Sequence, residues 1–299
     1  MNTNDTTPYT EGIGRAVAHL ARTLDEAVEL DALAREAAFS PFYFHRIFRG
    51  LVGETPVELH RRLRLERAAT QLVNGAAPVT RIAFDAGYET HESFTRAFKA
   101  AYGSSPTEFR ALGAEACGPR IALPAQSGVH FGVKHTPSFV NVDAQLDVAV
   151  DEQPSLRLAT LRHSGPYFRI SETFGKLGEV AGPLGLFQKP GTVMLAVFHD
   201  DPETTPANEL RSDAALSLAK GDAMPKGLTE LVLRPGRYAR LTHEGPYEGL
   251  PDKWLRLIGQ WLPRSGHRLA DAPSYELYRN PPSEGMPTKP VTDLYVPLA

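Results

Sequence analysis

Two arginines, a histidine and a phenylalanine recur at helical spacing within residues 40–56 and could contact nucleic acid. They are Phe42, His45, Arg46 and Arg49. On the opposite side the same spacing forms an apolar face, made of Phe44, Ile47, Phe48 and Leu51. A helix anchored by that face could enter a DNA groove, where an arginine pairs with guanine O6 and N7. The alternative is an ordinary amphipathic surface helix.

The same stretch returns fifty residues later, at residues 90–106. The residues that return are Phe94, Arg96, Phe98 and Lys99, in place of Phe44, Arg46, Phe48 and Arg49. Because the repeat keeps the outward arginine as well as the inward aromatics, it indicates two DNA-reading helices. Each would follow a shorter helix and a tight turn, which is the helix-turn-helix pattern.

A longer helix should join the two reading units. Thr55 and Pro56 begin it, and the pattern predicts that it runs to Val73. At about 1.5 Å per residue this helix is roughly 25 Å long. It could therefore separate the reading helices by a distance near the roughly 34 Å repeat of the major groove. The basic run at residues 60–67 would supply a positively charged face.

The carboxy-terminal half contains a second repeat, with a period of eighty residues. The segment from Arg157 to Tyr167 returns from Arg237 to Tyr247, and both copies end in His-x-Gly-Pro-Tyr. Each copy reads as an alternating strand, a turn and a helix, followed by two further strands. We therefore predict a duplicated strand-strand-helix-strand-strand unit, with two α+β halves related by a pseudo-twofold axis and a cleft between them.

Candidate ligand-binding chemistry lies where the two copies differ. Matching the ends of the equivalent strands aligns Glu276 with Val197, so the fold does not require an acid there. Alternation places Glu276 and Tyr278 on one face of their strand. A carboxylate among aromatic rings suits a cationic, partly apolar ligand. The candidate ligand-binding residues are Glu276, Tyr247, Trp254, Trp261, Tyr278, Tyr167 and Tyr295. The alternative is that the tryptophans belong to the core and Glu276 is an edge-strand acid.

Composition agrees with an ordinary globular protein of two domains. Of the 299 residues, 42% are hydrophobic and 22% are charged, and the net charge is −3. No apolar run reaches the roughly 18 residues that cross a membrane, and no secretory signal is recognisable. The single cysteine, Cys117, excludes an intrachain disulfide and a cysteine-cluster metal site. We expect a cytoplasmic protein with no metal, no cofactor and no membrane partner.

Glycines and prolines punctuate residues 113–146, which we interpret as a linker. Residues 129–133 could form a short strand within it. His130 and His135 are expected to be loop residues, because no second metal-ligating residue stands at a supporting spacing.

The double helix-turn-helix pattern resembles the AraC/XylS family of transcription regulators. The residues that carry the likeness run from Ile82 to Arg110 and read Ile-Ala-x-x-x-Gly-Tyr, Ser-Phe-x-Arg-x-Phe-Lys and Gly-x-Ser-Pro-x-x-Phe-Arg. The resemblance implies that two helices lie in successive major grooves. It places Phe42, His45, Arg46, Glu92, Ser93 and Arg96 at base-reading positions. Phosphate contacts are expected from Arg49, Arg62 and Lys99.

The carboxy-terminal half resembles the GyrI-like effector-binding domain of multidrug-sensing regulators. The likeness rests on both Gly-Pro-Tyr turns, on residues 275–278 with their Asn-Pro exit, and on residues 294–298. It implies that Glu276 lies in a pocket for cationic or amphipathic molecules. The same order of domains occurs in Rob-like regulators.

We therefore expect a multidomain protein: an all-α double helix-turn-helix domain at residues 8–112, a linker at 113–146 and an α+β duplicated GyrI-like domain at 147–299. The expected function is sequence-specific binding of double-stranded promoter DNA, with activation of transcription under control of a small effector and possible contact with RNA polymerase. We expect no enzymatic activity. Two alternatives stay open for the carboxy-terminal domain. It could hydrolyse small molecules with Glu276 and a tyrosine, or it could bind another protein.

Overall fold

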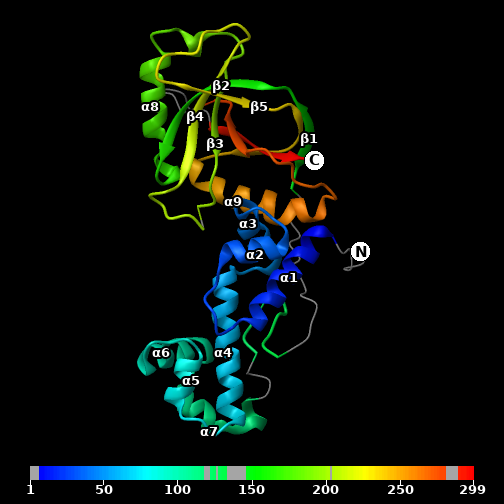
Figure 1. The fold of residues 1–299 in the computed structure, drawn as a ribbon, viewed down its shortest axis with the longest axis vertical. Helices are drawn as coiled ribbons and strands as arrows, with labels where there is room; N and C mark the ends of the chain where they lie inside the picture. Colours follow the sequence, from blue (N-terminus) through cyan, green and yellow to red (C-terminus); the bar gives the residue numbers. More distant parts are fainter. Residues whose placement is uncertain (1–6, 118–121, 126, 133–145, 203, 281–288) are drawn as a thin grey trace. The chain divides into compact units, whose positions relative to one another are not determined.

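A computed structural model describes residues 7–117, 122–125, 127–132, 146–202, 204–280 and 289–299 (Figure 1). The chain divides into two compact units, Met1–Val142 and Asp143–Ala299. We call them the helical unit and the sheet unit and describe each separately. Within the described residues, no helix is long and apolar enough to cross a membrane.

The helical unit contains the two predicted helix-turn-helix repeats. Its helices are α1 (Pro8–Arg22), α2 (Leu30–Ala37), α3 (Pro41–Val52), α4 (Pro56–Asn74), α5 (Val79–Asp85), α6 (His91–Tyr102) and α7 (Pro106–Cys117). The predicted reading helices are α3 and α6, and α4 is the predicted connecting helix.

Local signals in the sequence set the ends of these helices. Thr55 and Glu58 form a capping box at the start of α4, in which the Thr55 hydroxyl accepts from the Glu58 N–H and the Glu58 carboxylate accepts from the Thr55 N–H. At the carboxyl ends of α3 and α6, Gly53 and Gly103 adopt φ values of 84° and 77°. Glycine suits this left-handed cap because it has no Cβ atom.

Each repeat has its own aromatic core. Phe44 and Phe48 are fully buried in the first repeat, and Phe94 and Phe98 in the second. The second core also receives Leu123, from beyond α7.

The sheet unit is a single antiparallel sheet of eight strands with helices against it. Its strands are β1 (Val148–Gln153), β2 (Leu156–Ser164), β3 (Met194–Phe198), β4 (Arg211–Leu218), β5 (Thr229–Leu233), β6 (Gly236–Glu244), β7 (Tyr275–Tyr278) and β8 (Val291–Leu298). Its main helices are α8 (Ile170–Ala181) and α9 (Leu250–Leu255), and α9 continues into the π-helical η5 (Arg256–Trp261).

The strand order β1-β6-β8-β7-β3-β4-β2-β5 is symmetric about its centre. Each half consists of strand, strand, helix, strand and strand, as predicted, and β7 pairs with β3 where the halves meet. The fold class expected from the sequence is therefore confirmed. One detail of the alignment is wrong: sheet register places Glu276 opposite Ala196, and an eighty-residue shift also relates these two residues. Ala196, not Val197, is the equivalent of Glu276.

The two faces of the sheet bury different residues. Helix α8 packs on small and aliphatic side chains of β2 and β4, among them Ala159, Ala214 and Leu216 (Figure 1). The other face carries an aromatic cluster that includes Tyr238, Tyr275 and Tyr295. The faces alternate because successive side chains of a strand point to opposite sides.

Two expectations concern the segment between the units. Residues 129–132 are not a strand, and His130 contacts a glutamate of α4 instead. His135 and the greater part of the predicted linker lie outside the described residues.

Candidate functional site

The second reading helix, α6, presents a polar face to solvent. Glu92, Arg96 and Lys99 are exposed, at the four- and three-residue spacing that places them on one side of the helix. Ser93 is partly buried, and its hydroxyl donates to the Thr90 carbonyl at 2.9 Å. Within the described part of the chain, the Arg96 side chain makes no hydrogen bond or ion pair, so its guanidinium is available to an external acceptor.

The first reading helix, α3, differs from this pattern. Arg49 is exposed, but Arg46 lies over the Phe42 ring, with its guanidinium carbon 4.7 Å from the ring centroid. His45 is only 4% exposed, so its predicted place on an exposed face is wrong. The buried arc of α3 is wider than the predicted stripe, because Tyr43 is buried as well as Phe44.

The prediction of a phosphate contact is wrong for Arg62. Its guanidinium is buried and donates to both carboxylate oxygens of Glu54, at 3.1 and 2.6 Å. It also donates to Glu66 at 3.0 Å and to the Val129 carbonyl at 2.8 Å. Burial alone would lower the pKa of Arg62, but the hydrogen bonds and charges of Glu54 and Glu66 together outweigh it and raise the pKa. Arg62 is therefore a structural cation.

The rest of the basic run at residues 60–67 also serves the fold. Arg64 donates to the Leu24 carbonyl at 2.5 Å, and Arg67 joins Asp25 to the Asp85 carbonyl, at 2.6 Å each. In the sequence this run resembles a basic face for binding phosphate. Arginine can also neutralise acids and donate to backbone carbonyls, and here it does so. Its exposed member is Arg61.

In the sheet unit, Glu276 is held between two aromatic residues. Its side chain is 4% exposed. The indole N–H of Trp254 donates to Oε1 at 2.7 Å, and the Tyr278 hydroxyl donates to Oε2 at 2.9 Å. The bond to Tyr278 confirms that these two residues share a face of β7.

Further aromatic rings extend from this carboxylate. Tyr278 meets the rings of Tyr247 and Phe174 edge-on, with centroids 5.7 and 5.6 Å away. Trp254 meets Phe198 at 6.2 Å in the same manner. Tyr247 is 38% exposed and stands at the outer side of the group. We call these six residues the Glu276 cluster.

The two donors described here, the Trp254 indole and the Tyr278 phenol, are neutral groups. Burial raises the pKa of the Tyr278 phenol well above its usual value, and the nearby Glu276 charge raises it further. Burial and Glu276 raise the pKa of Tyr247 in the same way. Both phenols stay protonated at neutral pH, and Tyr278 remains a hydrogen-bond donor.

Two predicted ligand-binding residues lie away from Glu276. Trp261 stacks on His267 at 5.9 Å, because the π-helical turn shifts the phase of the helix by about one residue, roughly 100°. Tyr295 stacks on Tyr275 at 4.6 Å, and both belong to the aromatic cluster on the other face of the sheet.

Tyr167 stands at the edge of the Glu276 cluster. Its hydroxyl hydrogen-bonds the Asp200 backbone, and its ring lies 4.9 Å from Phe198. Phe198 and Phe174 were not predicted from the sequence. The eighty-residue repeat could have found both, because it pairs Phe174 with Trp254 and Phe198 with Tyr278.

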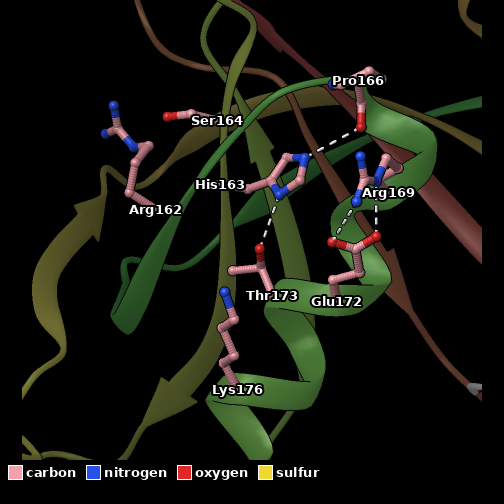
Figure 2. Close-up of a pocket in the computed structure, with 8 residues that line it drawn as sticks. All are labelled: Arg162, His163, Ser164, Pro166, Arg169, Glu172, Thr173 and Lys176. Carbon is pink, nitrogen blue, oxygen red and sulfur yellow. Dashed lines mark hydrogen bonds and ion pairs between the residues drawn. The ribbon is translucent and has the colours of Figure 1, made fainter. Parts of the chain in front are cut away.

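A separate hollow of about 220 Å³ lies between the end of β2 and α8 (Figure 2). It is lined by Arg162, His163, Ser164, Pro166, Arg169, Glu172, Thr173 and Lys176. Figure 2 shows His163 held between the Thr173 hydroxyl, at 2.8 Å, and the Pro166 carbonyl, at 3.1 Å. Arg169 is paired with Glu172 at 2.7 Å. The polar groups of His163 and Arg169 therefore already have partners within the chain. The bond from His163 to the Pro166 carbonyl stabilises the Gly-Pro-Tyr turn.

Among the residues that the structure describes, no group of three or more histidine, cysteine, aspartate or glutamate side chains could hold a metal ion.

Comparison with known proteins supplies the family of both halves. Residues 146–299 match the GyrI-like small molecule binding domain, and residues 33–112 match a helix-turn-helix domain. A DNA gyrase inhibitor of Yersinia enterocolitica is 32% identical over 136 residues, which cover 44% of this chain and 84% of that protein.

Two regulators of Salmonella typhimurium are also similar. Transcriptional regulator Rob is 24% identical over 246 residues, which cover 80% of each protein. Regulatory protein SoxS is 31% identical over 87 residues, which cover 29% of this chain and 81% of SoxS. The chain belongs to the GyrI-like family through its carboxy-terminal half and, as a whole, is a DNA-binding regulator of the AraC/XylS family with the domain order of Rob.

Proposed function

We propose that this regulator activates transcription when a lipophilic organic cation binds at the Glu276 cluster. The observation that carries the proposal is the buried Glu276 carboxylate, whose two oxygens accept from Trp254 and Tyr278. Neither donor brings a positive charge. The negative charge of the carboxylate would attract a cationic ligand.

The surrounding rings suit the same ligand. A cation over an aromatic face gains about 0.5–2 kcal/mol, and most from tryptophan. Trp254, Tyr278 and Tyr247 could supply faces or edges to an aryl-substituted cation, and Phe174 lies within contact of Tyr278. Because Tyr247 is the most exposed of these, we place the entrance of the ligand beside it.

For DNA, we propose that α3 and α6 each enter a major groove. The exposed Arg96, Glu92 and Lys99 support this role for α6, and Arg46, Phe42 and Arg49 support it for α3. The two sets differ in residue type, so the two halves of the DNA site should differ in sequence. Two reading helices in one chain allow a single molecule to occupy the whole site. We propose that the bound regulator contacts RNA polymerase.

The effector proposal is tested by titrating the full-length chain with tetraphenylphosphonium. The Trp261→Phe variant leaves Trp254 as the only tryptophan, so fluorescence reports the site directly. In that background, Glu276→Gln should weaken binding at least about tenfold, because a charge pair in a partly buried site contributes several kcal/mol. Glu179→Gln, at an exposed position on α8, is the control and should bind normally.

Neutral triphenylphosphine oxide separates charge from shape. It should bind the parent and Glu276→Gln chains equally. Equal affinity of both chains for the phosphonium would remove Glu276 from the site. An in vitro transcription assay on a promoter carrying the selected DNA site then tests whether the regulator activates or represses transcription. We expect more transcript with the cation than without it.

A further inference from the structure

Residues 122–125 and 127–132 follow α7 in sequence and return along α4, the helix that connects the two reading units. We call them the strap. Leu123 and Val129 are buried, and the strap lies in the helical unit. It is also the part of the chain that leads toward β1 of the sheet unit.

A single carboxylate on α4 holds the strap at both ends. Glu66 is 1% exposed. Its Oε1 accepts from the Leu123 N–H at 2.9 Å, and its Oε2 accepts from the Phe131 N–H at 2.8 Å. The Nδ1 atom of His130 lies 3.0 Å from Oε1. Glu66 therefore binds backbone groups at two separate places in the strap.

Arg62 ties the same strap to the first reading unit. It lies one turn before Glu66, bonds that carboxylate at 3.0 Å and donates to the Val129 carbonyl at 2.8 Å. Its other nitrogens bond Glu54, which follows the Gly53 cap of α3. The turn between α3 and α4 is thus connected to the strap through one guanidinium.

Leu123 ties the strap to the second reading unit. It packs in the core that contains Phe98, Tyr102 and Phe109. Burial raises the pKa of the Tyr102 phenol, and the Glu66 charge raises it further. Along α4, the strap consequently connects the turn of the first reading unit with the core of the second reading unit.

A buried ion pair is an unusual choice for stability alone, because well-packed hydrophobic residues of similar volume often stabilise as much or more. In some proteins, buried charged or polar groups select one arrangement of the chain among several. The Leu123 and Phe131 N–H groups donate to the two oxygens of Glu66 at once, and only one register of the strap along α4 allows both bonds.

We propose that Glu66 is a positioning residue for DNA recognition: by fastening the strap along α4, it holds α3 and α6 in one relative orientation and so determines the spacing of the two DNA elements that the chain binds. This inference rests on the proposed binding of DNA by both helices. It adds a residue that touches no DNA and acts through the strap.

The first measurement is hydrogen exchange by mass spectrometry on the full-length chain. In the wild type, peptides that cover the strap should be protected. Glu66→Gln keeps the side-chain volume but replaces one acceptor oxygen by an NH₂ group, so the strap amides should exchange at least about tenfold faster. Glu11→Gln, at an exposed position of α1, is the matched control and should leave the strap protected.

The second measurement is the dependence of DNA affinity on spacing. A bipartite site is first selected with the wild-type chain from a pool of random duplexes. Insertion of one base pair between its two elements rotates one against the other by about 35°. Wild type and Glu11→Gln should lose at least about tenfold in affinity on the inserted site. The Glu66→Gln variant should lose less than about threefold in affinity, because its two reading helices can reorient relative to each other. Leu123→Ala removes the side chain that anchors the strap in the second core and should show the same tolerance, which covers the case that Glu66→Gln does not fold.

The outcomes are separable. Tolerance of the insertion together with faster strap exchange supports the inference. Wild-type spacing dependence in a variant whose strap exchanges fast overturns it, and so does a strap that stays protected in Glu66→Gln. If the wild-type selection enriches no bipartite site, the proposed function fails, and the inference fails with it.

Discussion

Ala196 and Glu276 face each other across the central strand pair, β3 and β7, at the point about which the two halves of the sheet unit repeat. One half therefore places a methyl group where the other places a buried carboxylate. This difference makes the Glu276 cluster asymmetric, as do Trp254 in place of Phe174 and Tyr278 in place of Phe198, although the backbone around it is duplicated. Paired residues at this point have Cβ atoms about 4.5–5.5 Å apart.

Restoring symmetry with a second acid should destabilise the sheet unit. In Ala196→Asp, two carboxylates would lie about 5 Å apart, a repulsion of roughly 3 kcal/mol at an effective dielectric constant of 20. Ala196→Asn controls for size and polarity. Urea unfolding followed by tryptophan fluorescence should show the aspartate variant less stable than the asparagine variant at neutral pH. The gap should shrink toward about pH 4, where one carboxylate takes a proton. An equal stability of the two variants at neutral pH would mean that Glu276 is not charged.

The two tryptophans should report ligand binding unequally. Trp254 donates to Glu276, whereas Trp261 stacks on His267. Trp254→Phe should abolish the fluorescence change on adding tetraphenylphosphonium, and Trp261→Phe should keep it. A change that survives in Trp254→Phe would place the ligand elsewhere in the unit.

On α6, Arg96 and Lys99 should differ in their effect on DNA binding. Arg96→Ala should cost about 1–3 kcal/mol on the selected site and relax the preference for one base pair. Lys99→Ala should weaken binding to all sequences alike and lower the salt slope by about one, as expected for a lost phosphate contact. Fluorescence anisotropy at several salt concentrations measures both. The assignment fails if Arg96→Ala weakens random and selected duplexes equally.

Arg62 should act on stability and not on phosphate binding. Arg62→Ala leaves Glu54 and Glu66 without their shared cation and should destabilise the helical unit by about 3–5 kcal/mol. Arg61→Ala, its exposed neighbour, should stay within about 0.5 kcal/mol of wild type. Thermal unfolding followed by circular dichroism measures the difference. At a temperature where Arg62→Ala is folded, its DNA binding should keep the wild-type salt slope; a slope lower by about one would instead indicate a phosphate contact.

Asp213 should contribute to the acid sensitivity of the sheet unit. Burial alone would raise the pKa of this carboxyl, but hydrogen bonds from His199 and Arg162 outweigh it and lower the pKa below 3.8. Its stabilisation is therefore present above the unfolded-state pKa and is lost as the pH falls through the lower folded-state value. Asp213→Asn should lower the free energy of unfolding by about 1.5–3 kcal/mol at about pH 6 and by much less at about pH 3. A constant difference across that range would assign the effect to packing.

Several parts of this architecture could be predicted from sequence because they depend on local chemistry. The fifty-residue echo of Phe44 and Phe48 predicted two matched helical cores, since an apolar stripe at helical spacing must be buried. The eighty-residue echo predicted the duplicated sheet unit. Alternation within β7 placed Glu276 beside Tyr278.

Several candidate site residues lie elsewhere than predicted because sequence spacing does not show what a side chain meets in the fold. Arg62 reads like a phosphate ligand, but Glu54 and the strap lie over it. A π-helical turn rotates Trp261 away from Glu276. Tyr295 lies on the opposite face of the sheet from Glu276.

By itself, the sequence determined the repeats, the helix caps and the aromatic and acidic residues that the effector site could use, because these follow from the periodicity and chemistry of neighbouring residues. Only the tertiary structure decided which of these residues meet. Contacts such as Trp254 with Glu276, or Glu66 with the strap, join segments far apart in the chain, and their geometry depends on the packing of whole elements.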